Sequence, residues 1–153
     1  MSTVLQPGGM IRPMVPEDID AIMVIEREIH AYPWTRGNFI DSLQAGYSCW
    51  VHERDHEMVG YAVLMVVPDE AHLLNISVSK PFQGRGVGRE LLAQLVGIAR
   101  GYLAQTMFLE LRPSNTAARR LYDGLGFNEI SIRRGYYPAK NGREDAVLMG
   151  LAL

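Results

Sequence analysis

The chain has 153 residues, of which 48% are hydrophobic, and a formal net charge of −2. This composition excludes a disordered chain and a protein that binds nucleic acid through a broad basic surface. No apolar run reaches membrane-spanning length, and residues 1–9 lack the basic and apolar regions of a signal peptide. The single cysteine, Cys49, cannot form an internal disulfide, which fits a cytoplasmic protein. We therefore predict one domain over residues 1–153, with residues 1–9 as a flexible extension.

The first elements that the sequence predicts are a short strand over residues 10–14 and a helix that begins at Pro16. Proline suits a first helical turn, and an apolar stripe with helical spacing follows it. Only one member of this stripe, Glu26, is polar. A second short helix, capped by Thr35, ends before Gly46.

Two strands, 47–52 and 58–67, follow and are joined by a charged turn. His52 and His56 flank this turn, but no cysteine or clustered carboxylates accompany them, so we predict no metal site. These strands precede the glycine-rich region, whereas a doubly wound nucleotide-binding fold normally begins with such a region.

Residues 72–102 read as a strand, a glycine-rich loop and a helix. The strand alternates between two faces and ends at Pro81. Beyond the loop, apolar residues at helical spacing predict a helix that opens near Arg85 and ends near Gly101. The loop itself is Gln83-Gly84-Arg85-Gly86-Val87-Gly88-Arg89, whose glycines let the backbone approach an oxyanion and whose arginines add charge. This pattern indicates an anion-binding site.

The loop alone leaves the identity of the anion open. A Walker loop needs a lysine after its second glycine, and the dinucleotide fingerprint needs a third glycine where this chain has Arg89. A glycine-rich helix start that binds no ligand would also explain the pattern.

A strand over residues 106–112, which Pro113 ends, completes a strand–helix–strand unit. Such a unit crosses over right-handed and leaves its two strands parallel, with a ligand site at their carboxyl ends. Glu110 lies near that end in an otherwise apolar strand, where burial would make it a more effective general base. An ion pair with Arg112 or a neighbouring arginine would also explain Glu110, as would ribose binding in a dinucleotide fold.

The last third of the chain begins with a helix that Ser114 or Asn115 caps and that ends at Gly126-Phe127. Tyr122 in this helix is expected to pack beneath Phe127, although a phenol near a thioester would also be a useful acid. The segments that follow are predicted as strand 127–136, loop 137–145 and strand 146–153. The whole pattern predicts a mixed α/β sheet of about seven strands, antiparallel at first and with one parallel pair.

Several motifs occur in the order of one enzyme superfamily. They are Asn75-Ile76-Ser77-Val78, the glycine-rich loop, Leu109-Glu110-Leu111-Arg112, Ser114-Asn115-x-x-Ala118 and Leu121-Tyr122-x-x-Leu125-Gly126-Phe127. In these motifs the chain resembles the GCN5-related N-acetyltransferases, with Gly84 where their loop often has a larger polar residue. Three further segments resemble the branch that acetylates the N-terminal alanine of a ribosomal protein: His30-Ala31-Tyr32-Pro33-Trp34, Ile132-Arg133-Arg134-Gly135-Tyr136-Tyr137-Pro138 and Asn141-Gly142-Arg143-Glu144-Asp145-Ala146.

This resemblance implies that the chain uses acetyl-coenzyme A (acetyl-CoA) to acetylate the N-terminal alanine of small-subunit ribosomal protein number eighteen. It implies no metal, no direct contact with nucleic acid and no membrane. Glu110 would be the general base and Tyr122 the general acid. The implied cofactor-binding residues are Ile76, Ser77, Val78, Gly84, Arg85, Gly86, Val87, Gly88, Arg89 and Asn115. The parallel strands would splay to admit coenzyme A, and helices would cover both faces of the sheet.

Four aromatic residues are candidates for the walls of a peptide groove: Tyr32, Trp34, Tyr136 and Tyr137. They would equally suit a seal between a helix and the sheet. Two other functions stay open, a non-catalytic acyl-CoA sensor and a dinucleotide-binding protein. The glycine-rich loop is compatible with all three functions, whereas Glu110 as general base and Tyr122 as general acid are needed only by the transferase.

Overall fold

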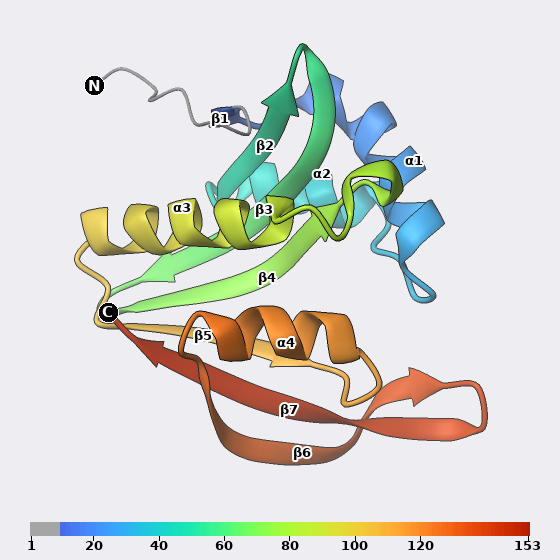
Figure 1. Ribbon diagram of the computed structural model, residues 1–153, viewed down its shortest axis with the longest axis vertical. Coiled ribbons are helices and arrows are strands. Elements are labelled where there is room, and N and C mark those ends of the chain that lie inside the picture. Colours follow the sequence, from blue (N-terminus) through green and yellow to red (C-terminus); the bar gives the residue numbers. More distant parts are fainter. Residues whose placement is uncertain (1–9) are drawn as a thin grey trace. The chain divides into compact units, whose positions relative to one another are not determined.

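The computed structural model describes residues 10–153, so the extension predicted over residues 1–9 lies outside the described part of the chain. Seven strands form one mixed sheet in the order β1-β2-β3-β4-β5-β7-β6, which confirms the predicted fold class (Figure 1). The strands are β1 (Met10–Pro13), β2 (Ser48–Arg54), β3 (Glu57–Val67), β4 (Glu70–Val78), β5 (Thr106–Leu111), β6 (Asn128–Ala139) and β7 (Gly142–Ala152). The helices are α1 (Ile19–Ile29), α2 (Arg36–Gln44), α3 (Val87–Gly101) and α4 (Thr116–Gly124), with short 3-10 turns η1 (Pro16–Asp18) and η2 (Lys80–Phe82). None of the described helices is long and apolar enough to cross a membrane.

Strands β4 and β5 form the parallel pair that the strand–helix–strand pattern predicted. Their register runs from Glu70 opposite Thr106 to Leu73 opposite Leu109. Strand β4 itself continues to Val78.

The chain divides into two compact units. The first unit comprises residues 10–65 and Asn75–Leu95, and the second comprises Val66–Leu74 and Val96–Leu153. This division does not test whether residues 1–153 form one domain, which stays a prediction.

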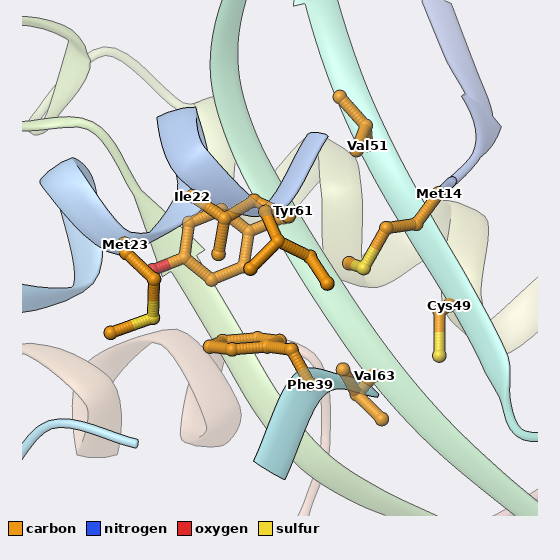
Figure 2. Close-up of a cluster of buried hydrophobic side chains, with 9 residues drawn as sticks. Met14, Ile22, Met23, Phe39, Cys49, Val51, Tyr61 and Val63 are labelled. Carbon is orange, nitrogen blue, oxygen red and sulfur yellow. The ribbon is translucent and has the colours of Figure 1, made fainter. Parts of the chain in front are cut away.

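Helices α1 and α2 close the hydrophobic core of the first unit. Ile19, Ile22 and Met23 of α1 are buried, as the helical spacing of the stripe predicts. Thr35 caps α2 as predicted, since its hydroxyl accepts a hydrogen bond from the Asn38 N–H at 3.1 Å. The core cluster contains Met14, Ile19, Ile22, Met23, Phe39, Cys49, Val51, Tyr61 and Val63 (Figure 2).

Gly60 and Tyr61 are neighbours on β3 and therefore face opposite sides of the strand. Tyr61 belongs to the core under α1, with its ring centroid 5.8 Å from that of Phe39. A Cβ on Gly60 would lie 3.5 Å from Leu91 Cδ2 of α3 and only 2.7 Å from the Ser77 backbone oxygen. Helices thus cover both faces of these strands, and only glycine permits so close an approach to Ser77.

Helix α4 of the second unit begins and ends as predicted. Of the two predicted caps, the structure uses Asn115, whose Oδ1 accepts a hydrogen bond from a backbone N–H of the first turn at 3.1 Å. At the other end, the Phe127 N–H donates to the Tyr122 carbonyl and the Gly126 N–H donates to the Asp123 carbonyl, both at 3.1 Å. This pair of bonds is the Schellman motif, which brings the Tyr122 and Phe127 positions together.

The loop predicted over residues 137–145 is wrong. Strand β6 runs on to Ala139, which pairs with Gly142 of β7, so most of this segment belongs to a hairpin. Pro138 and the surrounding polar residues favoured a loop. Strand β6 stands at the end of the strand order and is largely exposed, and proline and polar residues are tolerated at such an edge.

Candidate functional site

The glycine-rich loop lies at the start of α3 in the first unit. Gly84 and Gly86 have φ angles of +75° and +81°, in the left-handed region that favours glycine. Because these residues interrupt a helical backbone, the helix begins at Val87, two residues after Arg85, near which the sequence predicted its start. In the first turn the Glu90 N–H donates to the Gly86 carbonyl at 3.0 Å. The N–H groups that precede it at a helix start lack intrahelical carbonyl partners, which suits an anion.

The charges around the loop also favour an anion. Arg85 and Arg89 are exposed beside it. The one acidic side chain of the first turn, Glu90, contacts β2 instead: its Oε1 lies 3.1 Å from His52 Nε2 and its Oε2 lies 3.5 Å from an Arg54 nitrogen. Because Arg54 balances Glu90, an incoming anion would meet the two exposed arginines without opposition from this carboxylate.

The end of β4 presents its backbone rather than the Ser77 hydroxyl. Ser77 is buried, and its hydroxyl donates to Asn75 Oδ1 at 2.7 Å while lying 2.8 Å from His30 Nε2. Its neighbours Ile76 and Val78 are half-buried. Any ligand of this segment would therefore bind its backbone groups, as the resemblance implies.

Glu110 lies on β5 in the second unit and is exposed, so the burial expected from the sequence is wrong. Strand alternation buries Leu109 and Leu111 and leaves 32% of the Glu110 side chain accessible. Its Oε2 lies 3.9 Å from Nη1 of Arg133, so a neighbouring arginine forms the ion pair that the sequence offered as an alternative. A pair at this distance and exposure is weak. Glu110 is an accessible carboxylate, and a base role must come from its position rather than from desolvation.

Tyr122 is buried in α4, and its ring centroid lies 5.7 Å from that of Phe127, which confirms the packing role. Among residues 10–153 its hydroxyl has no hydrogen-bond partner. Burial, with a smaller contribution from Tyr137, raises the pKa of Tyr122 to about 12. The phenol therefore keeps its proton at neutral pH and can act only as a donor.

The connection between β5 and α4 is braced by Glu144 of β7. Its carboxylate accepts the Ser114 N–H at 2.8 Å and lies 3.3 Å from Arg112 Nη1. Hydrogen bonds from Ser114, followed by the effect of Arg112, lower the pKa of Glu144. The next residue, Asn115, uses its Oδ1 for the helix cap.

Of the aromatic candidates in the first unit, Trp34 is half-buried and Tyr32 is exposed. The Trp34 ring centroid lies 5.0 Å from that of Phe39, so this side chain seals the core. Tyr32 is 46% exposed. Only Tyr32 is thus presented on the surface as the groove hypothesis requires.

In the second unit, Tyr136 and Tyr137 pack against each other on β6 with ring centroids 5.0 Å apart. The Arg133 guanidinium lies 4.5 Å from the Tyr136 ring centroid, within range of a cation–π contact. Burial, and then the nearby Glu110, raises the pKa of Tyr137 to about 12. Because Tyr137 also influences Tyr122, four of the predicted residues of this unit, Glu110, Tyr122, Tyr136 and Tyr137, lie near one another.

Two residues near these candidates carried no role in the sequence reading. Arg133 contacts both Glu110 and Tyr136. Glu26 is almost completely buried, and its polar character within an apolar stripe was the signal. Across residues 10–153, no three His, Cys, Asp or Glu side chains gather in a way that could hold a metal ion.

Residues 19–127 match the Acetyltransferase (GNAT) family. The chain belongs to this family.

This GNAT chain is similar in sequence to the ribosomal protein bS18-alanine N-acetyltransferase of Escherichia coli strain K12. The two are 41% identical over 136 residues, which cover 89% of this chain and 92% of that protein. The crystal structure of the ribosomal-protein-S18-alanine N-acetyltransferase from Escherichia coli matches with a TM-score of 0.87 and 40% identity, over 93% of this chain and 92% of that one. The structure of yncA from Salmonella typhimurium with its cofactor acetyl-CoA shares the fold, with a TM-score of 0.79 and 24% identity over 94% of this chain and 92% of that one.

Proposed function

We propose that this protein transfers the acetyl group of acetyl-CoA to the N-terminal alanine of ribosomal protein bS18. The observation that carries the proposal is the similarity to the Escherichia coli enzyme named for this reaction. The two sequences are 41% identical over an alignment that covers 92% of that enzyme. Membership of the GNAT family supports acetyl-CoA as the co-substrate. No feature of the described residues favours a sensor or a dinucleotide-binding protein over this function.

The cofactor-binding part of the proposal rests on the first unit. The N–H groups at the start of α3, with Arg85 and Arg89, would hold the pyrophosphate. A Cβ on Gly84 or Gly86 would project into open space, where the pyrophosphate is proposed to approach the backbone. A side chain at either position would also be strained, because both φ angles are positive. Backbone groups of Ile76–Val78 would bind the pantetheine and the thioester. For Asn115, which belongs to the second unit, the contact with coenzyme A rests on the family resemblance alone.

The chemistry assigned to the second unit is direct transfer. An α-amine has a pKa of about 7.7–8.0, so roughly a tenth or more is already unprotonated at neutral pH. Glu110 would take the amine proton, directly or through one water, as the nitrogen attacks the thioester carbonyl. When the carbon–sulfur bond breaks, the thiolate would take the Tyr122 proton. Backbone N–H groups would stabilise the intermediate oxyanion.

The proposal is tested by incubating the purified protein with acetyl-CoA and a peptide that begins with alanine and contains one internal lysine. Fragmentation mass spectrometry should place the new acetyl group on the α-amine and not on the lysine. The same peptide with a blocked α-amine should not react. Tight binding of acetyl-CoA without acetylation of any peptide would favour the sensor, and binding of NAD in its place would favour the dinucleotide reading.

Tyr136 is expected to contact the peptide. Replacing this exposed tyrosine with alanine should raise the KM for the alanine-initiated peptide about tenfold, because an aromatic wall is lost, and should leave the KM for acetyl-CoA unchanged. Tyr102→Ala is the matched control, since Tyr102 is also an exposed tyrosine of the second unit and directly follows the C-terminal end of α3. Steady-state kinetics with each substrate varied in turn provide the measurement. A lower Tm with normal peptide kinetics would instead make Tyr136 a packing residue.

A further inference from the structure

The first unit contains a buried carboxylate to which the proposed reaction gives no role. Glu26 of α1 is only 1% exposed. Its Oε1 accepts hydrogen bonds from the Tyr61 hydroxyl at 2.6 Å and from Asn75 Nδ2 at 3.3 Å, and its Oε2 accepts the Trp34 N–H at 2.9 Å. Figure 2 shows the Tyr61 ring among the core side chains next to α1. Three donors from three different elements therefore meet at one carboxylate.

The hydrogen bonds that join His30, Ser77 and Asn75 form a chain in which each residue donates to the next one towards Glu26. The Ser77 hydroxyl has one proton, which it donates to Asn75 Oδ1, so it accepts from His30 Nε2 at 2.8 Å. Asn75 in turn donates to Glu26. The network from His30 through β4 thus ends at the Glu26 carboxylate, which only accepts.

This network holds the segment 30–34 at both of its ends. His30 is attached through its ring to Ser77, and Trp34 is attached through its backbone N–H to Glu26 and through its ring to Phe39. Between these two anchors the chain exposes Tyr32. A short segment fixed at both ends presents its middle residue in a defined place with little entropy left to lose on binding.

Stability alone gives a poor account of a carboxylate at this position. Glu26 occupies the buried face of α1 together with Ile22 and Met23, where an apolar side chain would pack without losing hydration. A buried charge is costly unless its partners are well placed, and here one partner is the backbone of the segment that carries Tyr32. The contact with that segment is what a leucine could not supply.

We propose that Glu26 is a positioning residue for the peptide substrate, and that it acts by fixing segment 30–34 against β3 and β4. The proposal rests on the function proposed above, because it assigns Tyr32 to the peptide side of the site. Glu26 contacts neither substrate. The acetyl-CoA side depends on the backbone of β4, which also pairs with β3 in the sheet. Directly after β4, the Ser79 N–H donates to the Val59 carbonyl at 2.8 Å.

The test replaces Glu26 with glutamine, which has the same shape but offers only one acceptor oxygen. Its amide nitrogen must then face a donor, either the Trp34 N–H or the side chains of Tyr61 and Asn75. We expect the KM for the alanine-initiated peptide to rise about tenfold and the KM for acetyl-CoA to stay within about twofold. Amide hydrogen exchange over residues 30–34 should become faster, because the anchor at Trp34 is weakened.

Asp18→Asn is the matched control. Asp18 is also a buried carboxylate of the first unit, next to the other end of α1, and it accepts hydrogen bonds from Arg12 at 2.7 and 2.9 Å. Its loss should lower the Tm without changing peptide KM or exchange over residues 30–34. Tyr61→Phe is a milder second variant for the case that Glu26→Gln does not fold. It removes one donor while keeping the ring in the core, and a rise of a few-fold in peptide KM is expected.

The outcomes separate this inference from the proposed function. A lower Tm for Glu26→Gln with unchanged peptide KM and unchanged exchange would make Glu26 a purely structural residue. An equal rise in peptide KM for Asp18→Asn would mean that any loosening of the unit has this effect. If Glu26→Gln does not fold and Tyr61→Phe has normal peptide kinetics, the inference also fails. A wild-type protein that acetylates no peptide would overturn the proposed function, while the exchange measurement would still report on the anchor.

Discussion

Glu110→Gln is expected to lower kcat by roughly 10²-fold or more while the affinity for acetyl-CoA stays within a few-fold. Glutamine keeps the size of the side chain but cannot accept the proton of the attacking amine. The protein should remain as stable as the wild type, because Glu110 is accessible and its ion pair with Arg133, at 3.9 Å, is weak. Single-turnover kinetics with saturating peptide, together with a direct binding assay for acetyl-CoA, measure the two effects separately.

The control for this variant is Glu129→Gln. Glu129 is also an accessible carboxylate of the second unit paired with an arginine, Arg119, at 3.2 Å. Removing its charge should leave kcat unchanged. Normal turnover of Glu110→Gln would reduce Glu110 to the ion-pair role, and an equal loss in both variants would point to a general effect of charge.

Tyr122→Phe is expected to lower kcat by roughly 10- to 10²-fold, because the leaving thiolate would have to find its proton in water. The Tm should barely change. The ring contact with Phe127 is retained, and in the described part of the chain the lost hydroxyl has no hydrogen-bond partner to leave behind. Thermal unfolding and steady-state kinetics on the same preparation test both halves of this prediction.

The pH dependence provides a second check on Tyr122. Its pKa of about 12 keeps the phenol protonated up to alkaline pH, so the rate of the wild type should rise through the pKa of the substrate amine and show no fall between pH 8 and about 10. A decline in that range would mean that a group other than Tyr122 supplies the proton. A normal kcat for Tyr122→Phe would leave this residue with packing alone.

The features that the sequence predicted well are those that depend on neighbouring residues. The Asn115 cap and the Gly126-Phe127 end of α4 need only a short stretch of chain, and both occur as expected. The glycine-rich loop is similar, since the positive φ angles of Gly84 and Gly86 follow from local sterics.

The environment of Glu110 could not be predicted in the same way. Strand β5 has apolar residues at consecutive positions, Met107, Phe108 and Leu109, so its pattern does not reveal which face is covered. The structure buries Met107 and Leu109 and leaves Glu110 on the more open face. The partner Arg133 comes from β6, and nothing local to β5 indicates it.

The surroundings of Glu26 could not be predicted from the sequence either. Helical spacing placed it on the buried stripe of α1, but its partners Tyr61 and Asn75 come from β3 and β4, much further along the chain. Only the folded arrangement of the first unit turns one polar residue in an apolar stripe into a junction of three donors. The sequence predicted the position of Glu26 on the buried face of α1 but not its hydrogen-bond partners.

The most direct test of the proposed function is mass spectrometry of small-subunit ribosomal proteins from cells with and without this protein. We predict that bS18 carries an acetyl group on its N-terminal alanine in the first case and lacks it in the second, and that re-expression of the wild type but not of Glu110→Gln restores it. A bS18 N-terminus that is equally acetylated in both cells would contradict the proposed substrate. Loss of acetylation from a different protein would assign this GNAT enzyme to that substrate instead.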